Sequence, residues 1–284
     1  MKQIDFSYNN TIDASLPTIS ISSVLGMLNK PFDSKGVAEK TYNKHFNNPD
    51  SQYYQKTVDQ IMEMWEEKGA ESRHYGTMLD DYIGLNLNEA EETDMMLWKL
   101  DNDYDNDERL KSVCNSFDHF LEKMREHNIE YIDREQTVYY PISIQLPGDT
   151  TEHKYYIKGR FDALFYDQQR NKYIIVDWKS SNTIDKQNRW EKLLGPVKHL
   201  DACNWNTYTL QGNFYKTALI ENYLPEGTTY DDVEFRIAQL PGHVLENGLD
   251  YEIHKPAFMY DKQLMDNIYK YAALKNELQK KSAS

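Results

Sequence analysis

The chain has 284 residues, of which 39% are hydrophobic and 27% are charged, so it can form a sizeable core and general disorder is excluded. Its net charge of −14 argues against a protein that coats nucleic acid by bulk electrostatics, although a local basic groove or bound cations could still hold nucleic acid. The sequence contains no apolar run near the roughly 18 residues of a membrane span. The polar segment 1–13 lacks the apolar stretch of a signal peptide. We therefore expect a cytoplasmic protein that does not contact membranes.

The first half of the chain is patterned as helices. Apolar residues recur at helical spacing in several segments, and Gly69 stands where one of these helices could end. The predicted helices cover residues 18–30, 53–68, 75–85 and 108–127. We expect residues 1–130 to form a helical N-terminal part that packs on the rest of the chain.

After residue 130 the pattern changes to the alternation that is typical of strands. Short polar links separate the first three predicted strands, which favours antiparallel neighbours. The predicted strands cover 137–146, 155–166, 173–180, 233–240 and 249–254, and the predicted helices cover 205–223 and 260–280. This order predicts an α+β (mixed α/β) fold, in which a central, mostly antiparallel sheet is flanked by helices. Residues 131–284 would form the core, and the two parts would make one structural unit.

One apolar strand, YIIVDWKS (173–180), ends in an acid and a base. Strand alternation places Asp177 and Lys179 on one face and Trp178 on the other. The preceding strand supplies Asp162, which a six-residue turn could bring beside Asp177. Two neighbouring carboxylates repel each other unless a proton or a cation lies between them, so the pattern favours a divalent metal with oxygen ligands. Taken alone, D-x-K could equally be an ordinary salt bridge at the end of a strand.

Three motifs in order resemble a known family. KGRFDALF contains G-x-x-D, IIVDWKSS contains an apolar run followed by D-x-K, and LQGNFY contains Q-x-x-x-Y. The last motif places Gln211 and Tyr215 on one helix face. Together these motifs resemble the PD-(D/E)XK nuclease superfamily, and most of all its RecB-like and lambda-type exonuclease branch. The resemblance implies a restriction-endonuclease-like core.

The resemblance also implies roles for individual residues. Asp162, Asp177 and the main-chain carbonyl of Trp178 match the family's metal ligands, and Lys179 matches its catalytic lysine. Gln211 and Tyr215 complete the catalytic set by holding the substrate or the lysine strand. The implied cofactor is Mg²⁺ or Mn²⁺.

Three further residues extend this candidate site. Glu135, in DREQTVYY, lies where the branch often has a glutamate at the start of its first strand. The branch's G-T-x-x-H helix reads GTMLD here, so Asp80 stands at the histidine position. A carboxylate can also ligate Mg²⁺ or Mn²⁺, and we expect Asp80 to be a metal ligand. His74 is an alternative ligand or an ordinary surface residue.

The resemblance implies a metal-dependent deoxyribonuclease, exonucleolytic or endonucleolytic, that acts in recombination, repair or phage DNA processing. Its partners would be DNA and a recombination or replication protein. One alternative is a catalytically silent protein that binds nucleic acid or a partner on a nuclease scaffold, which the acidic charge and the missing histidine would favour. A second alternative is a metallohydrolase that acts on small phosphate esters. The locally basic segment 186–199 could contact phosphates or be a solvated connector.

Overall fold

The computed structural model describes residues 4–145, 150–246, 248–256 and 262–283. Contacts divide the chain into two compact units, one of Met1–Lys30 with Ser112–Ser284 and the other of Pro31–Lys111. Residue 130, where the sequence analysis placed a boundary, lies inside the first unit. In the described part of the chain, no helix combines the length and the hydropathy that crossing a membrane requires.

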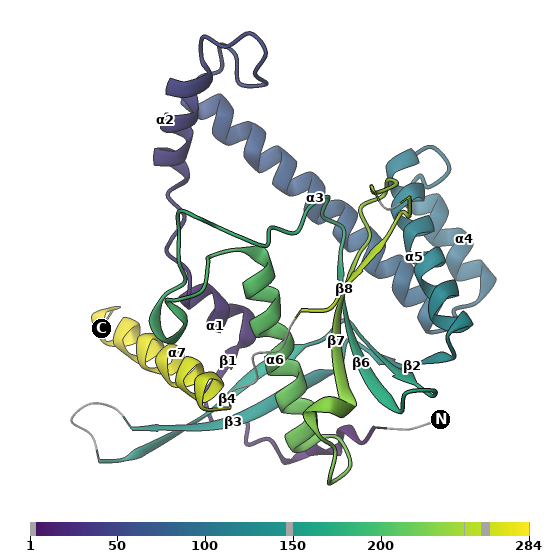
Figure 1. Ribbon diagram of the computed structural model, residues 1–284, viewed down its shortest axis with the longest axis vertical. Coiled ribbons are helices and arrows are strands. Elements are labelled where there is room, and N and C mark those ends of the chain that lie inside the picture. The colour runs from purple at the N-terminus through teal and green to yellow at the C-terminus, as the bar shows by residue number, and fades with distance from the viewer. Residues whose placement is uncertain (1–3, 146–149, 247, 257–261, 284) are drawn as a thin grey trace. The chain divides into compact units, whose positions relative to one another are not determined.

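The described strands of the first unit form two sheets (Figure 1). The smaller sheet has the order β1-β4-β3, with β1 (Thr18–Ser20), β4 (Glu152–Arg160) and β3 (Thr137–Gln145). The larger sheet has the order β2-β5-β6-β7-β8, with β2 (Ile129–Arg134), β5 (Ala163–Asp167), β6 (Lys172–Lys179), β7 (Val233–Gln239) and β8 (Glu252–His254). Among the described strand pairs of the larger sheet, only β6 and β7 run parallel. The mostly antiparallel sheet of an α+β fold is thus confirmed.

The prediction of a single strand over 155–166 is wrong. The segment forms β4 and β5, which belong to different sheets. Phe161 and Asp162 lie between them, outside both strands. The alternation of apolar and polar residues continues through this point, and for that reason the sequence pattern does not reveal the break.

The strand pairs β3–β4 and β2–β5 are two halves of one continuous antiparallel ribbon that bends from one sheet into the other. Arg134 pairs with Ala163 on one side of the bend, and Thr137 pairs with Arg160 on the other. No residue is gained or lost between these pairs, so the register of β3–β4 continues through the bend to Asp133, and it shifts only between Tyr131 and Asp133.

A main-chain hydrogen bond closes the ribbon at the bend. The N–H of Glu135 donates to the carbonyl of Asp162 over 3.1 Å. Glu135 has a φ of 52°, in the left-handed region that few side chains other than glycine adopt. The bend therefore brings Glu135 and Asp162 together where the chain leaves one sheet for the other.

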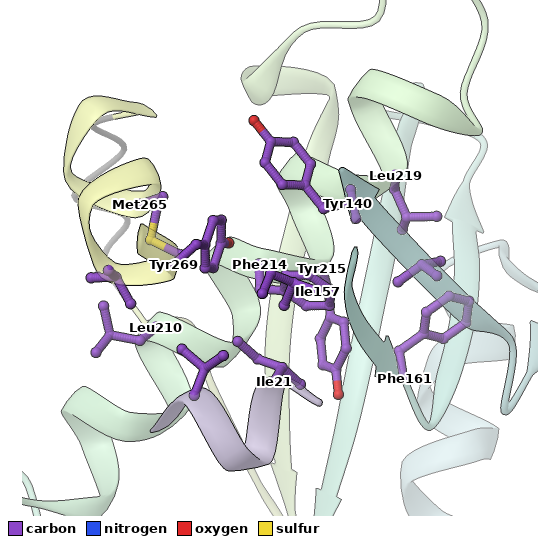
Figure 2. Close-up of a cluster of buried hydrophobic side chains, with 14 of the residues drawn as sticks. Ile21, Tyr140, Ile157, Phe161, Leu210, Phe214, Tyr215, Leu219, Met265 and Tyr269 are labelled. Carbon is purple, nitrogen blue, oxygen red and sulfur yellow. The ribbon is translucent and has the colours of Figure 1, made fainter. Parts of the chain in front are cut away.

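Several described helices of the first unit pack on these strands. They are the short η1 (Phe6–Thr11), η2 (Gly195–Val197) and η3 (Tyr230–Asp232), and the longer α1 (Ile21–Met27), α6 (Asn204–Asn222) and α7 (Lys262–Ala283). Figure 2 shows side chains of α1, α6 and α7 in one apolar cluster with residues of β3 and β4, among them Phe214, Tyr269 and Ile157. The predicted helix 18–30 consists of β1 followed by α1, whose N-cap is Ser20.

The opposite face of the larger sheet packs against α5 (Glu108–Glu126). The ring of Trp178 lies edge-on to Phe117 and Phe120, with centroid distances of 5.6 and 5.2 Å. Trp178 therefore points away from the α6 face, as strand alternation predicts, and anchors the end of β6 in an aromatic cluster.

The second unit is helical. It contains α2 (Ser34–His45), α3 (Val58–Leu87), α4 (Glu92–Asp101) and the start of α5. The two helices predicted over 53–68 and 75–85 are one helix, α3, which begins at a capping box formed by Thr57 and Gln60. Gly69 does not end it. An interior glycine costs only about 1 kcal/mol relative to alanine, which the flanking helix formers outweigh.

Candidate functional site

The two aspartates of the sequence motifs are neighbours across strands β5 and β6. The regular pairing of these strands reaches Ala163 opposite Val176, and the next step in the same register joins Asp162 with Asp177. Oδ2 of Asp162 accepts a hydrogen bond of 2.8 Å from the main-chain N–H of Trp178, the residue after Asp177. Because the ribbon bends here, Asp162 lies outside β5. Its side chain therefore accepts the N–H of Trp178, where a main-chain carbonyl would do so in a regular strand pair.

A main-chain oxygen faces the same region. The N–H and C=O groups of one strand residue point to the same neighbouring strand. The N–H of Trp178 points to Asp162, so its carbonyl points to that side as well. The carbonyl of Lys179 points the other way and accepts from the N–H of Leu240 over 2.8 Å. The carboxylates of Asp162 and Asp177 and the carbonyl of Trp178 thus lie near the start of β5.

Lys179 lies against the acidic pair. Its Nζ is 2.5 Å from Oδ2 of Asp177 and 5.0 Å from the ring centre of Tyr208 on α6. Burial by itself lowers the pKa of the Lys179 ammonium, but attraction to Asp177 and Asp162 outweighs burial and raises that pKa above its ordinary value. The lysine is therefore a cation at neutral pH and offsets the repulsion between the two carboxylates.

The acidic pair has the chemistry of a divalent cation site. Asp177 is 2% exposed, and its Oδ2 is paired with the Lys179 ammonium. Such an oxygen keeps a lone pair for a ligand. Hard cations such as Mg²⁺ and Mn²⁺ take carboxylate and carbonyl oxygens. The residues therefore fit a divalent cation with oxygen ligands.

The described residues contain no group of three or more His, Cys, Asp or Glu side chains that could hold a metal ion. The side-chain ligands of a cation near the start of β5 would thus be the two aspartates. A cation there would complete its coordination with the Trp178 carbonyl, with water or with a substrate oxygen.

Gln211 and Tyr215 hold the strand that leads to Asp162. Nε2 of Gln211 donates to the hydroxyl of Tyr215 over 3.0 Å, and this hydroxyl donates to the carbonyl of Arg160 over 2.8 Å. Arg160 ends β4, just before the bend. Gln211 and Tyr215 therefore contact β4, the strand that leads to Asp162. The sequence analysis expected them to hold the substrate or the strand of Lys179.

The glycine of the G-x-x-D motif allows this contact. A Cβ on Gly159 would lie 2.5 Å from a ring carbon of Phe214 and 2.7 Å from one of Tyr215, closer than real Cβ contacts. Only glycine lets α6 approach β4 closely enough for the Tyr215 hydroxyl to reach Arg160. Gly159 thus allows Tyr215, from the Q-x-x-x-Y motif, to hold the strand that leads to Asp162.

Glu135 lies beside the aspartates through its backbone, but its carboxylate pairs with arginines. It is 3.2 Å from a guanidinium nitrogen of Arg134 and 3.2 Å from one of Arg160. In the described structure it does not join Asp162 and Asp177 in a three-carboxylate cluster.

Asp80 and His74 belong to the second unit, on α3. Asp80 is half-buried, and His74 is exposed with its ring 5.8 Å from that of Tyr75. That either residue serves as a metal ligand stays a prediction.

Tyr208 is a site residue that the sequence analysis missed. It precedes Gln211 by three residues and Tyr215 by seven, so helical spacing places all three on one face of α6. This spacing could have found it. Burial raises the pKa of the Tyr208 hydroxyl, so the ring stays a neutral neighbour of the Lys179 ammonium.

A comparison with family models identifies the family of the chain. The family model described as the PD-(D/E)XK nuclease superfamily matches residues 44–281. The crystal structure of SSO0001 is similar at 12% sequence identity, over 94% of this chain and 80% of that chain, with a TM-score of 0.38. Such a score supports no inference about function. A search of curated proteins gave no significant match.

Proposed function

Because the chain belongs to the PD-(D/E)XK nuclease superfamily, we propose that it is a metal-dependent nuclease that hydrolyses phosphodiester bonds of DNA. The observation that carries the proposal is the hydrogen bond from the N–H of Trp178 to Asp162, which brings two acids and a lysine to one sheet end. We propose further that the chain belongs to the RecB-like and lambda-type branch, whose motifs its strands and helix resemble.

In this proposal Asp162, Asp177 and the carbonyl of Trp178 would hold Mg²⁺ or Mn²⁺. A divalent cation, when bound, polarises a phosphate oxygen and lowers the pKa of a coordinated water. Lys179 orients the attacking water and offsets the negative charge that develops on the phosphate, a role suited to a residue that is protonated at neutral pH. Tyr215 positions Asp162 through the Arg160 carbonyl.

The loop between β6 and α6 supports a nucleic-acid substrate. Trp190 is 92% exposed, yet its main-chain N–H is held by Oδ1 of Asn188 over 3.0 Å. An exposed aromatic ring on an anchored backbone is suited to stacking on a base, and Arg189 precedes it. A local contact of this kind is compatible with a net charge of −14.

The biological setting belongs to the same proposal. A nuclease of this type suits recombination, repair or phage DNA processing in the cytoplasm. A recombination or replication protein would be its partner.

The test is digestion of supercoiled plasmid and of end-labelled linear duplex, each with Mg²⁺, Mn²⁺ or EDTA. We expect cleavage that needs the metal and that Lys179→Ala reduces by about a hundred- to a thousand-fold. Loss of only the linear substrate would identify an exonuclease. DNA binding without cleavage under every condition would contradict the proposal and favour the silent scaffold protein, and turnover of small phosphate esters alone would favour the phosphatase alternative.

A further inference from the structure

A pocket of about 600 Å³ lies beside Lys179 in the first unit. Its walls come from the segment after β6, from the segment 243–246 and from the ends of β7 and β8. None of its lining residues has a role in the proposed hydrolysis.

Strand register fixes the distance between the pocket and the acidic pair. Lys179 pairs with Gln239 on β7, and Gln239 pairs with Glu252 on β8, so these three side chains share one face of the sheet. Two strand spacings separate Lys179 from Glu252, which is about 10 Å. A nucleotide bound at the acidic pair would have its neighbouring base within reach of the pocket.

A chain of hydrogen bonds sets the polarity of the inner wall. Nε2 of Gln239 donates to the carbonyl of Ser181 over 2.8 Å, so the amide oxygen of Gln239 faces His254. Nε2 of His254 lies 2.8 Å from that oxygen. An amide oxygen can only accept, so Nε2 carries the proton, and Nδ1 of the neutral imidazole is left as an acceptor.

A second acceptor faces this nitrogen. Nδ1 of His254 is 3.4 Å from Oε1 of Glu252. Burial lowers the pKa of His254, against the opposing effect of Glu252, and the imidazole is 6% exposed. The neutral ring and the carboxylate thus present two neighbouring acceptors, a pair that a ligand with two N–H groups would satisfy.

The charge of the lining excludes a phosphate as the occupant. Lys186 contributes one positive charge, whereas Glu246 and Glu252 contribute two negative charges. The apolar side chains of the lining belong to Ile184, Val244 and Leu245. A neutral, flat ring with hydrogen-bond donors at its edge fits such walls better than an anion does.

We propose that this pocket holds a nucleobase next to the scissile phosphate and that Glu252 and His254 select bases with an exocyclic amino group. Adenine, cytosine and guanine carry this group, whereas thymine and hypoxanthine lack it and present a carbonyl. A carbonyl in the position of the amino group would face the acceptors of Glu252 and His254. None of these three groups would then receive a hydrogen bond from the others. The proposal rests on the proposed function for the identity of the substrate.

The test compares binding of short single-stranded oligonucleotides of deoxyadenosine and of deoxyinosine to full-length Lys179→Ala protein in Mg²⁺. These bases differ at two neighbouring positions: adenine has an amino group at C6 and an acceptor nitrogen at N1, whereas hypoxanthine has a carbonyl at C6 and an N–H at N1. We expect deoxyadenosine to bind about tenfold more tightly, the scale of one well-placed base contact. Equal affinities would overturn the pocket assignment. Because binding needs no turnover, this outcome is separate from a failure of the wild-type protein to cleave DNA.

Two charge-matched variants, each made in the Lys179→Ala protein, sharpen the test. In Glu252→Gln an amide, which donates as well as accepts, replaces a carboxylate, which only accepts. The preference for deoxyadenosine should therefore fall to about threefold or less. Glu246→Gln makes the same charge change at an exposed pocket position and should keep the preference. The carboxylate of Glu252 is 43% exposed, so folding should not be affected. A preference unchanged in Glu252→Gln would overturn the role of this residue.

Discussion

The main-chain N–H of Trp178 donates to Oδ2 of Asp162 over 2.8 Å, which ties the acid of one sequence motif to the strand that carries the other. This bond explains how Asp162, which lies outside every strand, takes up a defined position beside Asp177. The bend in the ribbon creates the position, and the hydrogen bond holds it.

Lys179→Ala should reduce DNA cleavage by about a hundred- to a thousand-fold, because it removes the group that stabilises charge on the phosphate. Circular dichroism should show an unchanged fold. Lys280→Ala is the matched control, since Lys280 pairs with Glu277 on α7 and is 56% exposed. Equal cleavage by the Lys179 variant and the control would contradict the role of Lys179.

Asp162→Asn and Asp177→Asn should each weaken Mg²⁺ binding in calorimetry but should differ in stability. In Asp162→Asn the amide oxygen could still accept the N–H of Trp178, and the carboxylate repulsion would be relieved, so the metal-free Tm should stay equal or rise. Asp177→Asn leaves the Lys179 ammonium without its nearest partner and should lose about 2 kcal/mol, below the value for a fully buried pair. Undiminished Mg²⁺ binding in both variants would rule out the site.

Tyr215→Phe should weaken Mg²⁺ binding and reduce cleavage, because the Arg160 carbonyl loses the hydroxyl that holds the strand before Asp162. The lost hydrogen bond should also lower stability by about 1 kcal/mol. Tyr223→Phe removes the hydroxyl of another buried tyrosine, which donates to Asn9 and accepts from the N–H of Tyr139. A purely structural role for Tyr215 predicts the same Mg²⁺ affinity in both variants.

Lys216 gives the protein a pH-dependent stability that is separate from the site. This side chain is 5% exposed, and burial lowers its pKa from 10.5 to about 8. Between these two values the unfolded chain binds more protons than the folded one, so the free energy of unfolding rises with pH. Lys216→Met should stabilise the protein by roughly 2 kcal/mol at pH 7, with the gain fading toward pH 10.5.

Chemical denaturation across this pH range measures the effect. Lys198→Met is the control, since Lys198 is exposed. The same pH profile in wild type and Lys216→Met would contradict the assignment.

Asp80 is where the chain departs from the family's motif. If it ligates the cation, Asp80→Ala should lose activity with little change in Tm, and Asp80→His should remain active while its preference shifts away from Mg²⁺, because imidazole suits softer ions. Activity titrations with Mg²⁺, Mn²⁺ and Co²⁺ measure the shift. His74→Ala tests the alternative ligand, and loss of activity only in that variant would transfer the role.

The sequence predicted the residues at the end of β6 because strand periodicity is local and strong. Asp177, Trp178 and Lys179 lie on the faces that alternation assigns to them. The bend at Asp162 was not predictable, because apolar and polar residues alternate through it without interruption. β2 was missed because IEYIDR is short and its apolar residues do not alternate regularly with polar ones. Its pairing with β5 also joins residues that are 29 to 38 positions apart in the chain.

The pocket beside Lys179 lies further from prediction. Its polarity depends on the pairing of Gln239 with Glu252 and on the contact of Gln239 with Ser181. These contacts join different segments of the chain. The spacing of apolar and polar residues predicts only which side chains share a face within one helix or strand.

The short connection between β5 and β6 has a consequence for the order of folding. Asp162 and Trp178 are sixteen residues apart, so β5 and β6 can pair through a short loop at little entropic cost. The two carboxylates are then together before the distant β7 pairs with β6, and the cation that offsets their repulsion, Lys179, arrives on the same strand. We therefore expect β5–β6 substitutions to slow refolding and β7–β8 substitutions mainly to speed unfolding.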